Sequence, residues 1–303
     1  MVDFGIEESF QLAAKRMQEH HGVEINVSAI RQVTLIHAKR AEQLVTEIAL
    51  KPVPSKQMIL EMDGEMVPLV EYDQNVKDKR KAKRNFWAEL RLGAAQNQFE
   101  TSWKYAASLK TPDDLGNKMK GIMERLGQNE NTLVHGIGDG ALWIPEQGER
   151  IAAYKYSHLI DLYHLCDYFS DAVKSWTENS REEVDRLKNL CKEGKVETVV
   201  KELKNRQEID KNHEGLKACI QYIENRPGQF NYKKAIEKEL EIGSGAIESG
   251  HRHVIQKRLK KSGTWWLREN AASMADLRTI RINGNWEKLW QQNSNGEWLL
   301  FAA

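Results

Sequence analysis

The sequence has little of what marks exported or low-complexity proteins. Its three cysteines, Cys166, Cys191 and Cys219, are odd in number, widely spaced and without a CxxC pair. This pattern encodes neither a disulfide framework nor a cysteine zinc site, and it favours a reducing cytoplasm. With only 6 prolines and 20 glycines among 303 residues, a collagen-like or low-complexity chain is excluded.

Long apolar runs and an excess of one charge are also lacking. No run approaches the roughly 18 apolar residues of a membrane helix, and the start, MVDFGIEESF, lacks the basic and apolar regions of a signal peptide. The net charge is +1, because 45 basic residues balance 44 acidic ones, so the sum does not decide for or against nucleic acid. Basic residues nevertheless cluster in 77–84 (KDKRKAKR) and 251–261 (HRHVIQKRLKK). Each cluster is either a DNA-contacting patch or a solvated face.

The first fifty residues have a helical period. One apolar rhythm runs from Phe10 to Met17 and stops at Gly22, and a second begins after Asn26 or Ser28. Residues 1–50 are therefore predicted to be helical. Two such helices are either half of a helix-turn-helix that contacts DNA or an ordinary packing unit.

The period then changes to that of strands. Residues 58–70 (MILEMDGEMVPLV) alternate, which predicts a half-buried strand with carboxylates on one face. Residues 86–95 (FWAELRLGAA) suit either a second strand or a second and a third strand. A helix is predicted for 113–126. The apolar runs 133–137 and 157–160 predict two buried strands, each followed by an aspartate.

A long helical stretch follows. Residues 169–241 are charged and helix-periodic without a strand signal, so they read as a helical insertion. The chain then meets the hinge Gly243-Ser244-Gly245, whose Ser244 is a plausible helix cap. A helix from Ala246 to about Lys261 is predicted to stop at Gly263.

Four acids occupy special positions in this order. Asp63 lies within the first strand, Asp139 and Asp161 lie at strand ends, and Glu248 lies in the first turn of the last helix. Carboxylates that converge at strand ends suit Mg²⁺, and two such ions about 3.5–4 Å apart clamp the oxygens of a phosphodiester displacement. The pattern favours nuclease or strand-transfer chemistry, although a chain with 44 acids also places some at strand ends by chance.

Four motifs carry a family resemblance: EMDGEMVPL, HGIGDGALWI, LIDLYHL and GSGAIESGHRHVIQKRLKKSGTWW. Together and in this order they resemble the DDE transposases of bacterial insertion sequences, specifically the Kra and Lre type. The resemblance covers residues 58 to 290. It implies an α/β, RNase H-like mixed sheet, shared with hAT and Mutator-like enzymes, with a helical insertion and a small helical N-terminal segment. The implied catalytic domain is 56–168 with 242–290, the insertion is 169–241, and 291–303 is a tail.

The resemblance also implies the site. Asp63, Asp139 and Glu248 would hold two Mg²⁺ ions, for which Mn²⁺ can substitute. Asp161 and His164 match the family's (C/D)-x-x-H element and would be accessory to catalysis, for which the alternative is a helix-capping Asp161 and a packed His164. Glu61 and Glu65 share the face of Asp63, so the first ligand is assigned by motif rather than geometry.

DNA would be the partner, as transposon ends and target, bound by a homo-oligomer in the bacterial cytoplasm and nucleoid without any membrane. Helical spacing places Glu248, Arg252, Ile255 and Leu259 on one stripe and leaves His251, Lys257, Arg258 and Lys261 around it for phosphates. Trp265 and Trp266 either stack on unpaired bases or belong to the core. The predicted DNA-binding residues are Lys79, Arg80, Lys81, Arg84, Arg252, Lys257, Arg258, Lys261, Trp265 and Trp266.

The implied function is transposition, by metal-dependent hydrolysis at element ends and attack of the freed 3′-hydroxyl on target DNA. One alternative is a non-catalytic DNA-binding protein derived from a transposase. Another, a carboxylate-pair glycoside hydrolase, gives no role to KDKRKAKR or to the D-x-x-H spacing. Family members commonly have a further N-terminal region for terminal repeats, so the sequence predicts either a short complete enzyme or the downstream part of an interrupted frame.

Overall fold

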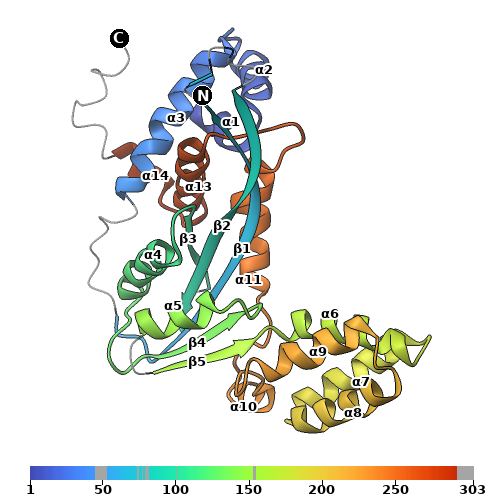
Figure 1. Cartoon of the computed structure of the whole chain (residues 1–303). Coiled ribbons are helices and arrows are strands. Elements are labelled where there is room, and N and C mark those ends of the chain that lie inside the picture. Colours follow the sequence, from blue (N-terminus) through green and yellow to red (C-terminus); the bar gives the residue numbers. More distant parts are fainter. Residues whose placement is uncertain are drawn as a thin grey trace. The chain divides into compact units, whose positions relative to one another are not determined.

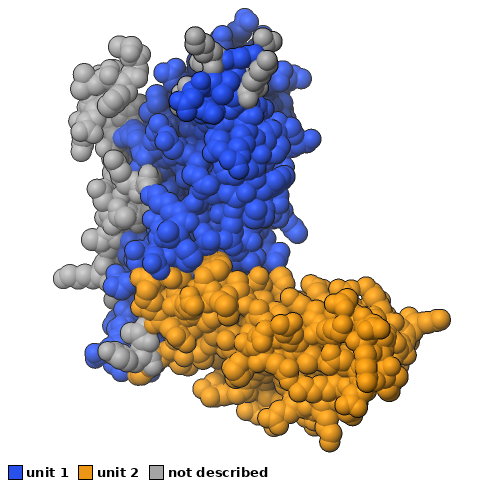
Figure 2. Space-filling model, viewed as in Figure 1, with its two compact units in different colours: residues 1–58, 62–132, 246–303 blue, residues 59–61, 133–245 orange. Residues whose placement is uncertain are grey.

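The computed structural model describes residues 1–44, 53–73, 75–76, 78, 82–99, 101–152 and 155–291 (Figure 1). The chain forms two compact units, which are coloured separately in Figure 2. Unit 1 comprises residues 1–58, 62–132 and 246–303, and unit 2 comprises 59–61 and 133–245. No helix in the described ranges is both long enough and apolar enough to cross a membrane.

Three helices form the N-terminal segment: α1 (Val2–Glu7), α2 (Phe10–His21) and α3 (Val27–Leu44). The Ser9 hydroxyl accepts a hydrogen bond from the Leu12 amide and caps α2, and Gly22 ends that helix in the left-handed conformation with φ of 65°. The Asn26 carboxamide accepts from the Ser28 amide at the start of α3. The two predicted helices are confirmed, and α1 precedes them.

Five strands form one mixed sheet in the order β3-β2-β1-β4-β5. They are β1 (Gln57–Tyr72), β2 (Lys83–Asn97), β3 (Lys104–Ser108), β4 (Leu133–Gly138) and β5 (Tyr156–Ile160). β2 and β3 are antiparallel, whereas β4 and β5 are parallel. Residues 86–95 belong to a single strand, and the third strand begins at Lys104. The antiparallel meander, the parallel pair and the helices between them confirm the predicted α/β, RNase H-like fold class.

Unit 1 has its core between the sheet and a set of helices (Figure 1). These are α1, α3, α11 (Gly245–Gly250), the π-helical segment His251–Gln256, α12 (Lys257–Leu259), α13 (Arg268–Ile282) and α14 (Trp286–Gln291). A further helix, α4 (Pro112–Arg125), packs against β2 and β3. α13 packs against both α3 and β3. Its Met274 and Leu277 are buried in one cluster with Leu90 and Leu92 of β2, and burial of such side chains stabilises the unit by about 1.5–3 kcal/mol each.

The π-helical segment is held by an arginine from α13. A π-helix bonds i to i+5, so it adds a residue to the turn and displaces carbonyls from the regular α ladder. The Arg278 guanidinium donates to the carbonyls of His253 and Val254, with Nε at 3.0 and 2.9 Å, and also to the carbonyl of Ile6. Arg278 is 5% exposed. The predicted helix from 246 to about 261 is therefore present from Gly245 to Leu259 without a break, but its faces shift at His251.

In unit 2, α5 (Trp143–Ala152) packs against β4 and β5. The other helices of this unit surround a second core. They are α6 (Leu162–Ala172), the short 3₁₀ turn Val173–Ser175, α7 (Ser180–Lys192), α8 (Val196–Ile209), α9 (Glu214–Glu224) and α10 (Tyr232–Glu237). Phe169, Leu203 and Tyr232 are buried in this core. The prediction of helices without strands between 169 and 241 is confirmed.

Acid should weaken unit 2 through a histidine on β5. Burial, followed by the neighbouring His135, lowers the pKa of His158 to about 4, and Tyr156 and His158 Nδ1 are 2.9 Å apart. A histidine in the unfolded chain takes up a proton below about pH 6.5, so stability falls as the pH drops from about 6.5 to 4. We expect a loss of about 2 kcal/mol between pH 6.5 and 5, measured by urea unfolding.

The matched variants are His158→Gln and His20→Gln. His158→Gln should flatten this pH dependence, whereas His20→Gln, which changes an exposed histidine of α2, should leave it intact. An unchanged slope in His158→Gln would assign the acid sensitivity to another group.

Candidate active site

Two of the predicted acids lie at one edge of the sheet in unit 2. β4 and β5 are parallel with Gly138 opposite Ile160, and the next residues are Asp139 and Asp161. The Asp161 amide donates to the Gly138 carbonyl at 2.9 Å, which ties the two strand ends together. This is the carboxyl edge, where ligands of α/β sheets bind. The structure thus places Asp139 and Asp161 beside one another, as their positions after parallel strands predict.

The loop after β4 is held against α9. Asp139 Oδ1 accepts from the Ala141 amide at 2.9 Å, and the Asp139 carbonyl accepts from the Tyr222 hydroxyl at 2.6 Å. Arg226 Nε donates to the Gly140 carbonyl at 2.8 Å. Gly140 has φ of +94°, and a Cβ there would lie 2.4 Å from Arg226 Nε, so glycine is required both for the turn and for this approach. These bonds to the carboxylate and to the backbone of the loop fix the position of the Asp139 carboxylate.

Asp161 is a fully engaged, buried carboxylate. Its Oδ1 accepts from the amides of Tyr163 and His164 at 2.5 and 3.2 Å and so caps α6. Its Oδ2 accepts from the Ser244 amide at 2.6 Å and from the Ser244 hydroxyl. These four bonds use the lone pairs of both oxygens. The Ser244 hydroxyl of the predicted hinge is therefore directed at Asp161.

His164 is half-buried in the first turn of α6, where the D-x-x-H spacing predicts it. Its backbone amide is part of the Asp161 cap, and Asp161 is 3% exposed. The structure thus shows the helix-capping Asp161 that is the alternative to an accessory catalytic role. An accessory catalytic role for either residue stays a prediction.

In unit 1 a histidine bridges two acids of β1. His251 Nδ1 lies 3.1 Å from Glu65 Oε2, and His251 Nε2 lies 3.1 Å from Asp63 Oδ2. The Glu65 contact is a hydrogen bond, whereas the Asp63 contact is too poorly aligned for one and is an ion-pair contact. Residues 63 and 65 point to the same face of a strand, so one imidazole can span them. Gln256 and Lys260 donate to the other oxygen of Glu65, at 3.0 and 2.7 Å.

The charges of this cluster reinforce one another. Burial alone would lower the pKa of His251, but the nearby Asp63 and Glu65 carboxylates outweigh it and raise that pKa to about 9. Burial opposes ionisation of Glu65, yet bonds from His251, Lys260 and Gln256 bring its pKa below the usual value. His251 is therefore cationic at neutral pH, and Asp63 has a charged neighbour within unit 1.

Glu248 lies on α11, one turn before His251, and is exposed. α11 approaches the sheet closely because Gly250 has no side chain. A Cβ at Gly250 would lie 2.6 Å from Tyr105 and 2.7 Å from Leu92. The Tyr105 hydroxyl also donates to the Ala246 carbonyl at 3.2 Å. The residue after this contact is His251, so the same close approach positions the histidine.

Two of the predicted DNA contacts are buried, which corrects the prediction that they are exposed on the surface of the last helix and the segment after it. Arg258 is 1% exposed, donates through Nε to the Gly5 carbonyl at 3.0 Å, and lies over the rings of Phe10 and Trp266. Trp266 is 7% exposed and packs in the unit 1 core. His251, also expected to be available, is 3% exposed.

The predicted stripe along the last helix is also wrong. Glu248 and Arg252 are exposed, whereas Ile255 and Leu259 are buried. The physical reason is the π-helical turn, which adds a residue between the two halves and rotates the second half relative to α-helical spacing. The sequence gives no direct signal of this turn.

The other predicted DNA contacts are at the surface or outside the described residues. Arg252 and Lys257 are exposed, Arg84 pairs with Glu71 at 3.3 Å, and Lys261 pairs with Glu8 at 3.2 Å. Trp265 is half-buried and lies edge-on to the exposed Trp87, with ring centroids 6.0 Å apart. Lys79, Arg80 and Lys81 lie outside the described residues.

The structure thus yields two acidic arrangements, one in each unit. Asp139 and Asp161 are together in unit 2, while Asp63 and Glu248 belong to unit 1 with His251 between Asp63 and Glu65. Within the ranges that the structure describes, no group of three or more His, Cys, Asp or Glu side chains is arranged to hold a metal ion. The convergence of Asp63, Asp139 and Glu248 stays a prediction.

Sequence reasoning missed the residues that position these acids. Tyr222 of α9, Arg226 just after the end of α9 and Arg278 of α13 are far from the motifs in sequence and have no local pattern. His251 was seen only as one of several basic residues on a helix. Its spacing of three from Glu248 was the one available signal.

The chain matches the Uncharacterised protein family (UPF0236) over residues 1–294. The chain belongs to this family. A search of the curated proteins finds no match to this chain.

Two solved structures show weak similarity. The Drosophila P element transposase strand transfer complex has a TM-score of 0.33 at 10% identity and covers 98% of this chain and 81% of that one. The crystal structure of NurA with manganese has a TM-score of 0.11 at 13% identity, and the match covers 88% of this chain and 65% of that one. At these TM-scores neither similarity determines the fold, which follows from the strand order and the sequence of elements.

Proposed function

We propose that the chain is a DDE-type DNA transposase, which cleaves the ends of a mobile element and joins the freed 3′-hydroxyl to target DNA. The strand order supports this proposal, because the neighbouring strands β1 and β4 carry Asp63 and, directly after the strand, Asp139. Glu248 would complete the site from α11. The convergence of these three carboxylates is part of the proposal.

The donor chemistry of the three acids fits Mg²⁺, a hard cation that takes oxygen ligands. Asp63 is partly exposed, Glu248 is exposed, and the Asp139 carboxylate stands at the carboxyl edge of the sheet. Asp161 does not fit as a ligand, because its four hydrogen bonds already use both oxygens. Two ions bound by Asp63, Asp139 and Glu248 would activate the attacking oxygen and stabilise the leaving one.

The chain's own residues would hold these carboxylates in place. The Ala141 amide and the contacts of α9 fix Asp139, and His251 restrains Asp63 at the same time as Glu65. Asp161 and Ser244 join α6 to the segment that leads into α11. Positioning of this kind supplies much of the rate in phosphoryl transfer, since it removes the need to reorganise charged groups during the reaction.

A cleavage assay tests the proposal. DNA that carries the element's flanking ends should be cut with Mg²⁺ or Mn²⁺ and left intact with EDTA. Cleavage that persists in EDTA would contradict the metal-dependent mechanism. DNA binding without any cleavage under either ion would favour the alternative, a DNA-binding protein derived from a transposase.

DNA affinity should fall steeply with salt although the net charge is +1. Each phosphate contact on duplex DNA steepens the fall of log affinity by about 0.9 per log unit of salt. Changing Lys79, Arg80 and Lys81 together to Gln should therefore make the plot of log affinity against log salt less steep, by the equivalent of up to about three phosphate contacts. Fluorescence anisotropy across a salt series measures this slope.

A matched triple variant controls for the loss of charge. Lys120, Lys174 and Lys217 are surface lysines, and each pairs with an acid three or four residues away in the chain. Their replacement by Gln should leave the slope unchanged. An unchanged slope in the first variant would make 77–84 a solvated loop and leave the exposed Arg252 and Lys257 as the main cationic surface.

A further inference from the structure

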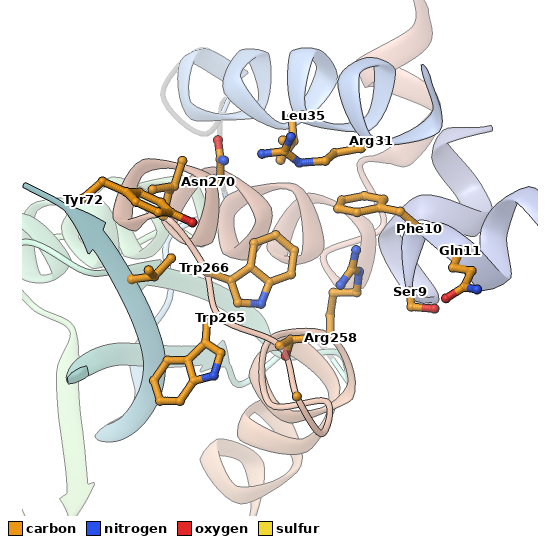
Figure 3. Close-up of a pocket in the computed structure, with 14 residues that line it drawn as sticks. Ser9, Phe10, Gln11, Arg31, Leu35, Tyr72, Arg258, Trp265, Trp266 and Asn270 are labelled. Carbon is orange, nitrogen blue, oxygen red and sulfur yellow. The ribbon is translucent and has the colours of Figure 1, made fainter. Parts of the chain in front are cut away.

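Unit 1 contains a cavity of about 460 Å³ that the acidic arrangement does not use (Figure 3). Its walls come from the start of α2, from α3, from the end of β1 and from residues 263–267 between α12 and α13. The volume falls within the range of small-ligand pockets, about 300–1,000 Å³. Among the described residues that line it are two arginines, Arg31 and Arg258, and no acid.

Aromatic side chains form part of the cavity wall. Figure 3 shows the indole of Trp266 between Tyr72 on one side and Phe10 and Arg258 on the other. Backbone bonds from Val70 to Trp266 and from Trp266 to Pro68, at 2.8 and 3.1 Å, hold this tryptophan beside β1. Tyr72 is 43% exposed, so its ring can be reached from solvent. The wall suits a flat, apolar ring.

Two buried donors in the same wall have no acceptor. Trp266 Nε1 and Arg258 Nη2 are without a hydrogen-bond partner among the described residues. Both side chains are buried, with Trp266 7% and Arg258 1% exposed. Unsatisfied buried donors are rare, and each one calls for an explanation. An acceptor on a bound ligand would supply the missing bonds.

The cavity also attracts anions. Ser9, Phe10 and Gln11 line it and form the start of the 12-residue helix α2, where backbone amides point outward and the helix dipole is positive. Arg31 is exposed at the rim. Burial and the neighbouring Arg278 lower the pKa of Arg258, but only to about 10, so this side chain is also a cation at neutral pH.

We infer that this cavity binds one unstacked nucleotide, with the base against Tyr72 and Trp266 and the phosphate toward Arg31, Arg258 and the start of α2. A nucleotide combines a flat ring, several acceptors and a negative charge, and the cavity offers a complement to each. The shared chemistry could come from an unpaired nucleotide of DNA or from a free nucleotide. The choice of DNA rests on the proposed function.

Binding of two fluorescein-labelled oligonucleotides to the intact chain tests this inference. One is a single-stranded thymidine oligomer and the other is an abasic oligomer of equal length, so they differ only in the bases. The wild-type chain should bind the thymidine oligomer more tightly. Tyr72→Ala should weaken that binding about tenfold and leave abasic binding unchanged, because stacking on an aromatic ring contributes only when a base is present.

Three further variants separate the parts of the site. Arg31→Gln should weaken binding of both oligomers, because it removes a phosphate contact. Its control is Arg16→Gln on α2, outside the residues that line the cavity, which should weaken binding of neither oligomer. Trp265→Ala removes the surface ring that packs on Trp87. It should have less effect than Tyr72→Ala, since its indole points away from that of Trp266 in Figure 3.

Several results would overturn the inference. Equal binding of the two oligomers, unchanged by Tyr72→Ala, would mean that the cavity does not bind a base. A larger loss in Trp265→Ala than in Tyr72→Ala would move base stacking to the Trp87–Trp265 pair. If free thymidine monophosphate displaced the thymidine oligomer at a concentration as low as that of the oligomer itself, the ligand would be a free nucleotide, and the DNA assignment would be overturned. Because Asp139→Asn should keep base-dependent binding, the inference and the proposed catalysis fail separately.

Discussion

Replacing Asp139 by Asn is expected to reduce cleavage and strand transfer by about a thousand-fold or more, because a charged ligand of the proposed metal ions is lost, an interaction that contributes several kcal/mol to the transition state. DNA binding should be largely retained, since lysines and arginines elsewhere supply the phosphate contacts. The side-chain oxygen of Asn can still accept from the Ala141 amide, and the Asp139 carbonyl still accepts from Tyr222. Cleavage and anisotropy on the same DNA measure the two effects.

The control is Asp167→Asn, which removes a charge from an exposed position of α6. It should leave both cleavage and binding unchanged. Loss of cleavage and binding together in Asp139→Asn would indicate misfolding rather than chemistry. Full cleavage by Asp139→Asn would remove this residue from the mechanism and, with it, the DDE assignment.

Replacing Arg278 by Met should destabilise unit 1 by about 3 kcal/mol or more, because the carbonyls of His253, Val254 and Ile6 would lose their donor while staying buried. Met has a similar length, so the main change is the lost hydrogen bonding. The melting temperature should fall by roughly 5–10 °C, as measured by calorimetry.

Arg281→Met is the matched control on the same helix. The Arg281 side chain is 37% exposed and pairs with Asp3 at 2.7 Å at the surface. A surface pair contributes about 0–1 kcal/mol, so this variant should melt within a few degrees of the wild type. Equal losses in the two variants would contradict the view that Arg278 supports the π-helical turn.

That turn explains why the last helix was only partly predictable. Its approximate extent follows from local signals, since it begins at the Gly-Ser-Gly hinge and ends at Leu259, shortly before Gly263. The direction of its side chains does not, because the extra residue of the π-helical segment depends on Arg278, which lies more than twenty positions further along the chain. Arg258 therefore seemed accessible from its spacing but is buried against Phe10 and Trp266.

The acids show the same division. Asp139 and Asp161 could be placed at one edge from sequence alone, because each follows a short apolar strand and parallel strands share an edge. What surrounds them could not. Their partners are distant in the chain: Ser244 and Tyr222 are each 83 residues from the aspartate that they contact, and Arg226 is 86 residues from Gly140. Such partners are chosen by the packing of α9 and of the hinge.

By itself the sequence determined the order of helices and strands, the mixed sheet and the positions of the motif acids, since periodicity, glycine and capping residues act over a few neighbours. Only the tertiary structure decided which charges are buried. It placed cationic His251 between Asp63 and Glu65 and used Asp161 as a cap. It also left Trp266 Nε1 and Arg258 Nη2, beside a cavity, without an acceptor among the described residues. Burial and hydrogen bonding depend on residues distant in the chain, and no local pattern contains that information.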